Sequence, residues 1–319
     1  MDLTDLYRHC TLCPRQCGVD RTAGQRGFCG QPAHIRAARA SLHQWEEPCL
    51  AGEQGAGTIF FTGCTMDCLF CQNQELKKPG AGWPVSPERF AQICLELEQK
   101  GAACLDLVTP TMFLPSLIPA IRLAREQGCT LPVVYNTSGY EQPNLLRLLE
   151  GTVDIWLPDF KYLSPNSAKM YSKTENYVEN ILSVLNEMVR QQPKPVFDAQ
   201  GRMKKGVLIR HLMLPGMERE TRQILRTIQK RYGNQVWFSL MSQYTPTPAV
   251  ADHPVLCRPV DPAVYQSTVR YALSIGLEQG FVQEEGAVSE SFIPDFSTGE
   301  GILHSISLPD SHCFSFQQE

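Results

Sequence analysis

Three cysteines stand close together in the segment GCTMDCLFCQNQ, where Cys64, Cys68 and Cys71 are separated by three and then two residues. Three thiolates can bind three irons of a 4Fe-4S cube and leave the fourth iron open to a cofactor or substrate. A structural zinc site needs a fourth ligand nearby, and the next Cys or His is Cys94, inside a predicted helix. The spacing therefore predicts a catalytic iron-sulfur cluster, with a structural zinc site as the alternative.

A second group of cysteines lies near the N-terminus. Cys10, Cys13, Cys17 and Cys29 are spaced by two, three and eleven residues. Four thiolates can complete a tetrahedral zinc site or hold a second iron-sulfur cluster, and the spacing leaves both open. Metal binding is favoured over four free thiols because these fifty residues offer little material for a core. In the iron-sulfur form, the site would relay electrons.

Composition excludes several classes of protein. The chain has 29 basic and 33 acidic residues, and it has no basic run that would follow a nucleic-acid backbone. It contains no apolar stretch long enough for a membrane span, and its start lacks the regions of a signal peptide. Seven of thirteen cysteines crowd into two short clusters, which is a poor pattern for a disulfide framework. We expect a soluble cytoplasmic protein with no nucleic-acid or membrane partner.

From about residue 58, β-branched runs alternate with amphipathic helical stretches. Strands are expected at residues 58–61, 105–108, 132–135, 153–157, 207–212 and 236–240. Such strand-helix repeats favour a parallel sheet covered by helices. Six repeats are fewer than the eight of a closed barrel, so we predict the α/β class and an incomplete (β/α)6 barrel, with an open doubly wound sheet as the alternative.

The chain divides into three predicted units. Residues 1–50 are rich in Cys, Gly and Arg and would form a small metal-binding module. Residues 51–283 carry the strand-helix repeats of the partial barrel. Residues 284–319 contain Ser, Gly, Pro and isolated aromatics and would form a loop-rich tail packed on the barrel.

Polar residues follow the predicted strands, where the working residues of parallel barrels lie. They are Thr109, Thr111, Asn136, Ser138, Asp159, Lys161 and Gln243. Each alone is an ordinary turn residue. Their joint placement around one rim predicts a binding site there.

The cysteine loop, with aromatic Phe70 just before its third cysteine, resembles that of the radical S-adenosylmethionine (SAM) superfamily. From Cys10 to the SESFIPDF tail the sequence resembles the PflX-type branch, relatives of pyruvate formate-lyase activating enzyme. The resemblance implies that SAM chelates the open iron and that one electron cleaves it to methionine and a 5'-deoxyadenosyl radical. That radical would remove hydrogen from a substrate, while the protein orients the reactants and excludes water.

The resemblance also implies roles for residues after the second and third strands. Thr109 and Thr111 occupy the place where activating enzymes carry a Gly-Gly-Glu type segment that receives the amine of SAM. Asn136 and Ser138 fall where relatives approach the ribose or a bound monovalent cation, with an Asp in the activating enzyme at the position of Asn136. All four are predicted SAM contacts.

Further predicted SAM contacts lie on the later strands. Asp159 and Lys161 match a D-x-K segment in which the lysine binds the SAM carboxylate; the alternative is a surface ion pair. Arg210 and His211 lie in the strand VLIRHLML, where alternation must send one of them inward. An interior guanidinium needs an anion, for which the SAM carboxylate is a candidate, and an interior His is commonly a hydrogen-bonded core residue. Gln243 stands near a histidine of the activating enzyme.

Three functions are consistent with these features. The first is an activase that makes a glycyl radical on a protein partner. The second is a radical SAM enzyme that modifies a small molecule or a peptide directly. The third is a non-catalytic iron-sulfur electron-transfer protein. The resemblance implies a flavodoxin or ferredoxin as electron donor.

Overall fold

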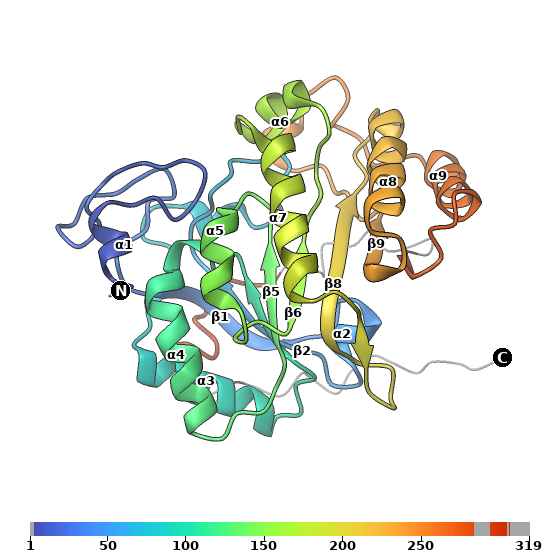
Figure 1. Cartoon of the computed structure of the whole chain (residues 1–319). Helices are drawn as coiled ribbons and strands as arrows, with labels where there is room; N and C mark the ends of the chain where they lie inside the picture. The colour runs from blue at the N-terminus through green and yellow to red at the C-terminus, as the bar shows by residue number, and fades with distance from the viewer. Residues whose placement is uncertain (1–2, 284–293, 305, 307–319) are drawn as a thin grey trace.

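A ten-stranded, mostly parallel sheet forms the centre of the protein (Figure 1). The computed structural model describes residues 3–283, 294–304 and 306. The parallel strands are β2 (Ala56–Phe61), β4 (Leu105–Val108), β5 (Val133–Thr137), β6 (Ile155–Pro158), β8 (Met203–Leu212), β9 (Trp237–Met241) and β10 (Gly280–Val282). The strand order is β10-β9-β8-β6-β5-β4-β2-β1-β3. Among the described residues, the end strands β10 and β3 do not pair with each other, so the barrel is incomplete, as predicted. The predicted α/β class is also confirmed.

All six predicted strands are present, and the structure adds four more. The added strands are β1 (Arg36–His43), β3 (Trp83–Pro84), β7 (Val196–Phe197) and β10. The segment of β1, RAARASLH, has no β-branched residue, and the others are two or three residues long. Such segments lack the local β signal and form strands because a neighbouring strand pairs with them.

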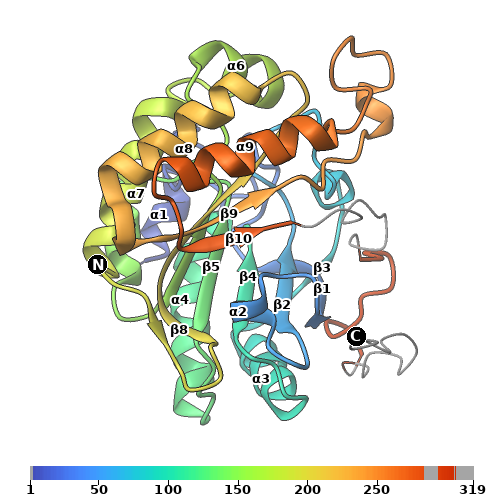
Figure 2. The ribbon, with the colours of Figure 1, turned by 90° about the vertical axis from the view of Figure 1, so that its right-hand side faces the viewer.

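Helices cover the outer face of the sheet (Figures 1 and 2). The longer ones are α3 (Pro87–Gln99), α4 (Leu114–Glu126), α7 (Tyr177–Gln191), α8 (Glu218–Tyr232) and α9 (Pro262–Ser274), and shorter ones are α1 (Asp5–Arg8), α5 (Pro143–Leu146) and α6 (Pro165–Ser172). The short helix α2 (Pro48–Ala51) packs instead against residues on the inner face. Helix α3 begins after a capping serine, since the Ser86 hydroxyl accepts a hydrogen bond from Arg89 N at 3.2 Å. No helix among the described residues is both long and apolar enough to cross a bilayer.

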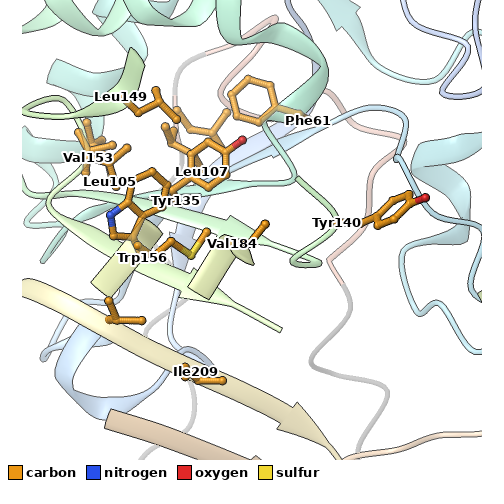
Figure 3. Close-up of a cluster of buried hydrophobic side chains, with 14 of the residues drawn as sticks. Phe61, Leu105, Leu107, Tyr135, Tyr140, Leu149, Val153, Trp156, Val184 and Ile209 are labelled. Atoms are coloured by element: carbon orange, nitrogen blue, oxygen red, sulfur yellow. The ribbon is translucent and has the colours of Figure 1, made fainter. Parts of the chain in front are cut away.

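The main core lies between the sheet and these helices (Figure 3). Outward-facing strand residues such as Leu107, Tyr135, Trp156 and Ile209 are fully buried there. The rings of Tyr135 and Trp156 have centroids 5.3 Å apart. The period-2 alternation of the strands therefore places apolar residues under the helices and the intervening residues inside the barrel.

Inside the barrel, two layers of side chains have opposite character. The lower layer is largely apolar, where Val134, Leu157 and Leu208 pack against Cys49 and Leu50 of α2. Its polar exception is the buried Asp106 of β4, which is in register with Val134. Helix α2 thus closes the bottom of the barrel. One layer higher along the same strands the inward residues are polar, namely Asn136, Asp159 and Arg210. The cavity therefore has a polar lining and lies above a layer of packed, mostly apolar side chains.

Strand β1 and part of the C-terminal segment pack together beside the cavity. β1 runs antiparallel to β2 and leads into α2. Phe296 packs edge-on against Phe60 at 5.2 Å, and Ala40 N donates to Glu300 O at 2.9 Å. β1 belongs to the predicted N-terminal module yet pairs in the main sheet, and most of the predicted tail lies outside the described residues. The division at residues 50 and 283 stays a prediction.

Candidate active site

The cysteine loop begins two residues after β2. Gly63 has a φ of 78°, and a Cβ there would lie 2.5 Å from Gln31 Cγ and 2.8 Å from the carbonyl oxygen of Cys29. Only glycine allows this backbone and this close approach. The loop that carries Cys64 is therefore packed directly against the N-terminal cysteine segment.

The three loop cysteines line one cavity of about 390 Å³. Their thiols are free. Ser172 Oγ donates to Cys68 Sγ at 3.0 Å, and Met66 N donates to Cys64 Sγ at 3.4 Å. Burial, with the neighbouring Cys68, raises the pKa of Cys64 to about 12 and that of Cys71 to about 11. Such thiols deprotonate when a metal centre binds them, and three of them at one cavity fit an iron-sulfur cluster with an open position.

Asp159 and Lys161, directly after β6, line the same cavity. Lys161 Nζ lies 2.6 Å from Asp159 Oδ2, and the two side chains are only 16% and 23% exposed. Burial disfavours the Lys161 cation, but Asp159 and Cys68 outweigh it and hold the Lys161 pKa above its ordinary range. The pair is thus a charged element of the cavity wall beside the cysteines and differs from an exposed ion pair.

Other predicted residues lie around this cavity. They are Phe70, Thr109, Asn136, Ser138, Arg210 and Gln243. Thr109 takes a φ of 59°, which is unusual for a β-branched residue. Gln72 Nε2 donates to the carbonyl oxygen of Gln243 at 3.2 Å, so the cysteine loop is tied to the end of β9. The structure brings together residues from five strand ends around this cavity.

Two predicted contacts lie elsewhere. His211 faces the helices, where its Nδ1 lies 2.7 Å from the carbonyl oxygen of Phe160 and its Nε2 lies 2.9 Å from Thr221 Oγ1. Both ring nitrogens are used in the core, because strand alternation sends Arg210 inward and His211 outward. Thr111 donates to Glu141 Oε1 at 2.6 Å and does not line the cavity. Neither residue is placed to contact a ligand there.

Arg210 already has anionic partners within the chain. Arg210 Nε lies 2.9 Å from Glu47 Oε1, and one terminal nitrogen lies 2.6 Å from Glu47 Oε2 and also bonds Glu46. Both glutamates line the cavity and their side chains are less than one tenth exposed. They come from the turn between β1 and α2. The sequence analysis did not identify Glu46 and Glu47 as site residues. The only signal for them was that Arg210, if it faced inward, would need an anionic partner.

The N-terminal cysteines gather at one end of the barrel, where the N-terminal segment packs beside α5 (Figure 1). Cys13 is close enough to Cys17 and Cys29 for their charges to interact, and Cys29 is close to Cys10 in the same way. Arg15 connects this segment to the cysteine loop, since its Nε donates to Thr65 O at 3.0 Å. Throughout residues 3–283 and the short described C-terminal part, no group of three Cys, His, Asp or Glu side chains has an arrangement that could hold a single metal ion.

Glu141 is a buried acid held by neutral hydroxyls. Thr111, Thr137 and Tyr135 donate to its carboxyl group, at 2.6 Å for Thr111 and 3.4 Å for Tyr135. Burial raises the pKa of Glu141 to about 7 despite these hydrogen bonds. The folded protein therefore binds a proton here more tightly than the unfolded chain does.

We expect the variant Glu141→Gln to be more stable than the wild type at high pH. Because the folded pKa is raised, the contribution of Glu141 is fully present below its unfolded pKa of 4.5 and is lost as pH rises through about 7. The shift corresponds to about 3 kcal/mol in favour of the variant at pH 8, and to less than about 1 kcal/mol at pH 5. Urea unfolding at both pH values measures this, with the exposed Glu179→Gln as control. A difference in the free energy of unfolding between Glu141→Gln and the wild type that does not change with pH would contradict this prediction.

The fold and this cavity define an α/β partial-barrel protein with a cysteine loop after its first parallel strand. The sequence model of the radical SAM superfamily matches residues 58–228 of the 319. The chain belongs to the radical SAM superfamily. Membership implies a 4Fe-4S cluster and SAM as cofactors, which the three cavity cysteines fit.

Individual proteins are similar to this chain in sequence or in fold. An uncharacterized protein of Methanocaldococcus jannaschii is 28% identical over 267 residues, covering 80% of this chain and 71% of the relative. HydG, a maturase of the FeFe-hydrogenase, is 12% identical with a TM-score of 0.50 over 70% of this chain and 50% of its own. Streptococcus suis SuiB, bound to its precursor peptide SuiA, is 10% identical with a TM-score of 0.50 over 70% and 47%. The chain spans about half the length of these two structures.

Proposed function

We propose that this protein holds a 4Fe-4S cluster through Cys64, Cys68 and Cys71 and cleaves SAM reductively to remove hydrogen from a substrate in the barrel cavity. The observation that carries the proposal is the convergence of three free thiols from one loop on a cavity that also contains Lys161. When bound, the cluster and SAM supply a 5'-deoxyadenosyl radical, a reagent that no side chain provides.

The tasks left to the chain are binding, orientation and exclusion of water. Lys161 provides a buried cation beside Cys68 for the carboxylate of SAM, and Asp159 holds that cation in place. Asn136 and Ser138 offer hydrogen bonds on the adjacent strand end. Phe70, buried against Tyr244, shields the loop from solvent.

The test is reductive SAM cleavage by reconstituted protein under anaerobic conditions. With dithionite and SAM, we expect 5'-deoxyadenosine and methionine in equal amounts by chromatography. Protein that binds a cluster but forms no 5'-deoxyadenosine would support the electron-transfer alternative and refute the proposal.

Direct modification of a polar substrate is the favoured form of this activity. The cavity carries Glu46, Glu47 and Arg210, whose side chains are at most 12% exposed. A glycine backbone, the target of an activase, has no charge to match such a lining, whereas a small molecule or a peptide side chain can have one.

Activation of a glycyl-radical protein is the second candidate. It rests on the resemblance of the cysteine segments to the PflX-type branch; the SESFIPDF motif lies mostly outside the described residues. Incubation with a co-encoded glycyl-radical protein and electron paramagnetic resonance separates the candidates, since an organic radical on the partner would favour the activase. A flavodoxin or ferredoxin donor and a cytoplasmic location complete this proposal.

The N-terminal cysteines are proposed to bind a second iron-sulfur cluster or zinc. Cys17 is the best residue to replace, because it is exposed whereas Cys10 packs with Tyr7 and Leu12. We expect Cys17→Ser to lose the metal of this site and keep the iron of the loop. Iron and zinc analysis of anaerobically purified protein measures both, and unchanged content of both metals would contradict metal binding here.

A further inference from the structure

The C-terminal end of α6 is bonded directly to the cysteine loop. Leu69 N donates a hydrogen bond to the carbonyl oxygen of Tyr171 at 2.9 Å. Asp67 N donates to the carbonyl oxygen of Ser172 at 3.2 Å, and Asp67 Oδ2 lies 2.6 Å from Lys173 Nζ. The last carbonyl groups of a helix have no partner within the helix, so the cysteine loop supplies donors that the end of α6 lacks. These backbone contacts fix the position of Ser172 relative to the loop.

The side chain of Ser172 bonds a sulfur of the loop. Its hydroxyl donates to Cys68 Sγ at 3.0 Å, across 104 residues of sequence. A serine in a helix commonly bonds the carbonyl oxygen four residues earlier, as Ser183 of α7 does with Glu179 at 3.0 Å. Ser172 is fully buried, so bulk water does not compete for its proton. The Ser172 hydroxyl is therefore committed to Cys68 and not to its own helix.

Tyr162 fixes the direction of this hydrogen bond. Tyr162 OH lies 2.6 Å from Ser172 Oγ, and the tyrosine is also fully buried. A serine hydroxyl has one proton, and a cysteine that binds iron is a thiolate with no proton to donate. Ser172 must then donate to the sulfur and accept from Tyr162. The two hydroxyls and the sulfur form a chain in which each hydrogen bond polarises the next.

A hydrogen bond to a ligand sulfur changes the reduction potential of an iron-sulfur cluster. The reduced cluster carries one more negative charge than the oxidised cluster, so a donor at its sulfur stabilises the reduced form more. Met66 N also donates to the loop, to Cys64 Sγ at 3.4 Å, but a backbone donor does not depend on its side chain. Ser172 supplies a side-chain donor at a shorter distance, which a single substitution removes.

We propose that Ser172, held by Tyr162, raises the reduction potential of the loop cluster by donating a hydrogen bond to its ligand Cys68. The inference rests on the proposed function, since it concerns the cluster assigned there to the three loop cysteines. Ser172 does not line the cavity, so it acts through Cys68 as a positioning residue. The electron comes from the donor protein or from dithionite, and the hydroxyl keeps its proton. The higher potential makes the cluster easier to reduce.

The variant Ser172→Ala tests this by redox titration of the reconstituted protein, followed by electron paramagnetic resonance of the reduced cluster. The signal of the loop cluster is identified by its change when SAM is added. We expect the equilibrium constant for its one-electron reduction to fall about tenfold, a shift of about 59 mV to lower potential. Iron and sulfide content should be unchanged. The control Ser183→Ala removes a hydroxyl that bonds only within its helix and should leave the potential unchanged.

An unchanged potential in Ser172→Ala overturns the proposal. Loss of iron from this variant also overturns it, because the hydroxyl would then serve the structure of the loop. A wild type that binds no cluster refutes the proposed function as well, so the two failures are distinguishable.

Tyr162→Phe provides a second variant, which keeps the serine donor and removes the group that orients it. Its potential should shift in the same direction by a smaller amount. Ser172→Ala leaves the Tyr162 hydroxyl buried without this partner, which costs stability. Should Ser172→Ala fail to fold, the double variant Tyr162→Phe, Ser172→Ala removes both hydroxyls and should show the tenfold change. A wild-type potential in the double variant would overturn the assignment of Ser172.

Discussion

Replacing Cys68 with alanine is expected to abolish formation of 5'-deoxyadenosine from SAM. Cys68 is the middle ligand of the proposed cluster and lies beside Lys161. Two thiols cannot hold the cube with one defined open iron, so we expect the rate to fall by about a thousandfold or more, a loss of ~4 kcal/mol of transition-state stabilisation. Chromatographic assay of 5'-deoxyadenosine, together with iron and sulfide analysis, measures both the activity and its cause.

The matched control for this experiment is Cys257→Ala. Cys257 is an exposed free thiol outside both cysteine groups, and its replacement should change neither iron content nor SAM cleavage. The fold of Cys68→Ala should survive, since the side chain gives up only one hydrogen bond from Ser172, worth about 1 kcal/mol. Full activity in Cys68→Ala, with the cluster retained, would show that the three loop cysteines do not hold the catalytic centre.

Replacing Arg210 with methionine is expected to have the largest effect on stability. The variant leaves Glu46 and Glu47 buried without their cation, which costs about 3–5 kcal/mol. In the wild type, burial opposes the Glu46 charge but Arg210 and His43 keep its pKa below the usual range, so its contribution is present above pH 4.5 and is lost on acidification. Without Arg210 burial dominates and the carboxyls favour the protonated form. The deficit should therefore be greatest near pH 8 and shrink towards pH 5.

Urea unfolding followed by circular dichroism at pH 5 and pH 8 measures this deficit. The control is Arg190→Met, which removes an exposed arginine that also bonds two glutamates and should change the unfolding midpoint little. The triple variant Glu46→Gln, Glu47→Gln, Arg210→Met should recover most of the stability, because it removes the uncompensated charges. If Arg210→Met unfolds at the same urea concentration as Arg190→Met at pH 8, the buried network is not what stabilises this part of the barrel.

The buried network also separates the two proposed forms of activity. An activase must accept a loop of another protein, whereas the charged lining suits a substrate with a polar group that enters the barrel. Arg210→Met would perturb substrate selection together with stability, while Glu46→Gln changes the lining without removing the cation. Comparing SAM cleavage in Glu46→Gln and in the wild type therefore tests the substrate side of the cavity while the cation is kept.

Features that depend only on neighbours along the chain were predictable from local sequence patterns. The spacing of Cys64, Cys68 and Cys71 is a property of one loop, and the strands and the α3 helix follow from local periodicity and capping. The rim of polar residues was predictable because all parallel strands end at one edge.

Which of these residues come into contact depends on packing between segments that lie far apart in the chain. Glu46 and Glu47 bond Arg210 although they are 164 and 163 residues away from it in the sequence. They follow β1, a strand that has no β-branched residue and is therefore not predictable from local sequence. Strand alternation requires one of Arg210 and His211 to face inward. His211 faces outward because its ring hydrogen-bonds Thr221 of helix α8, and Arg210 therefore faces inward. The sheet edge β10 likewise exists because β9 pairs with it. Such contacts arise from long-range packing, and a local sequence pattern does not indicate which distant residue or strand will be the partner.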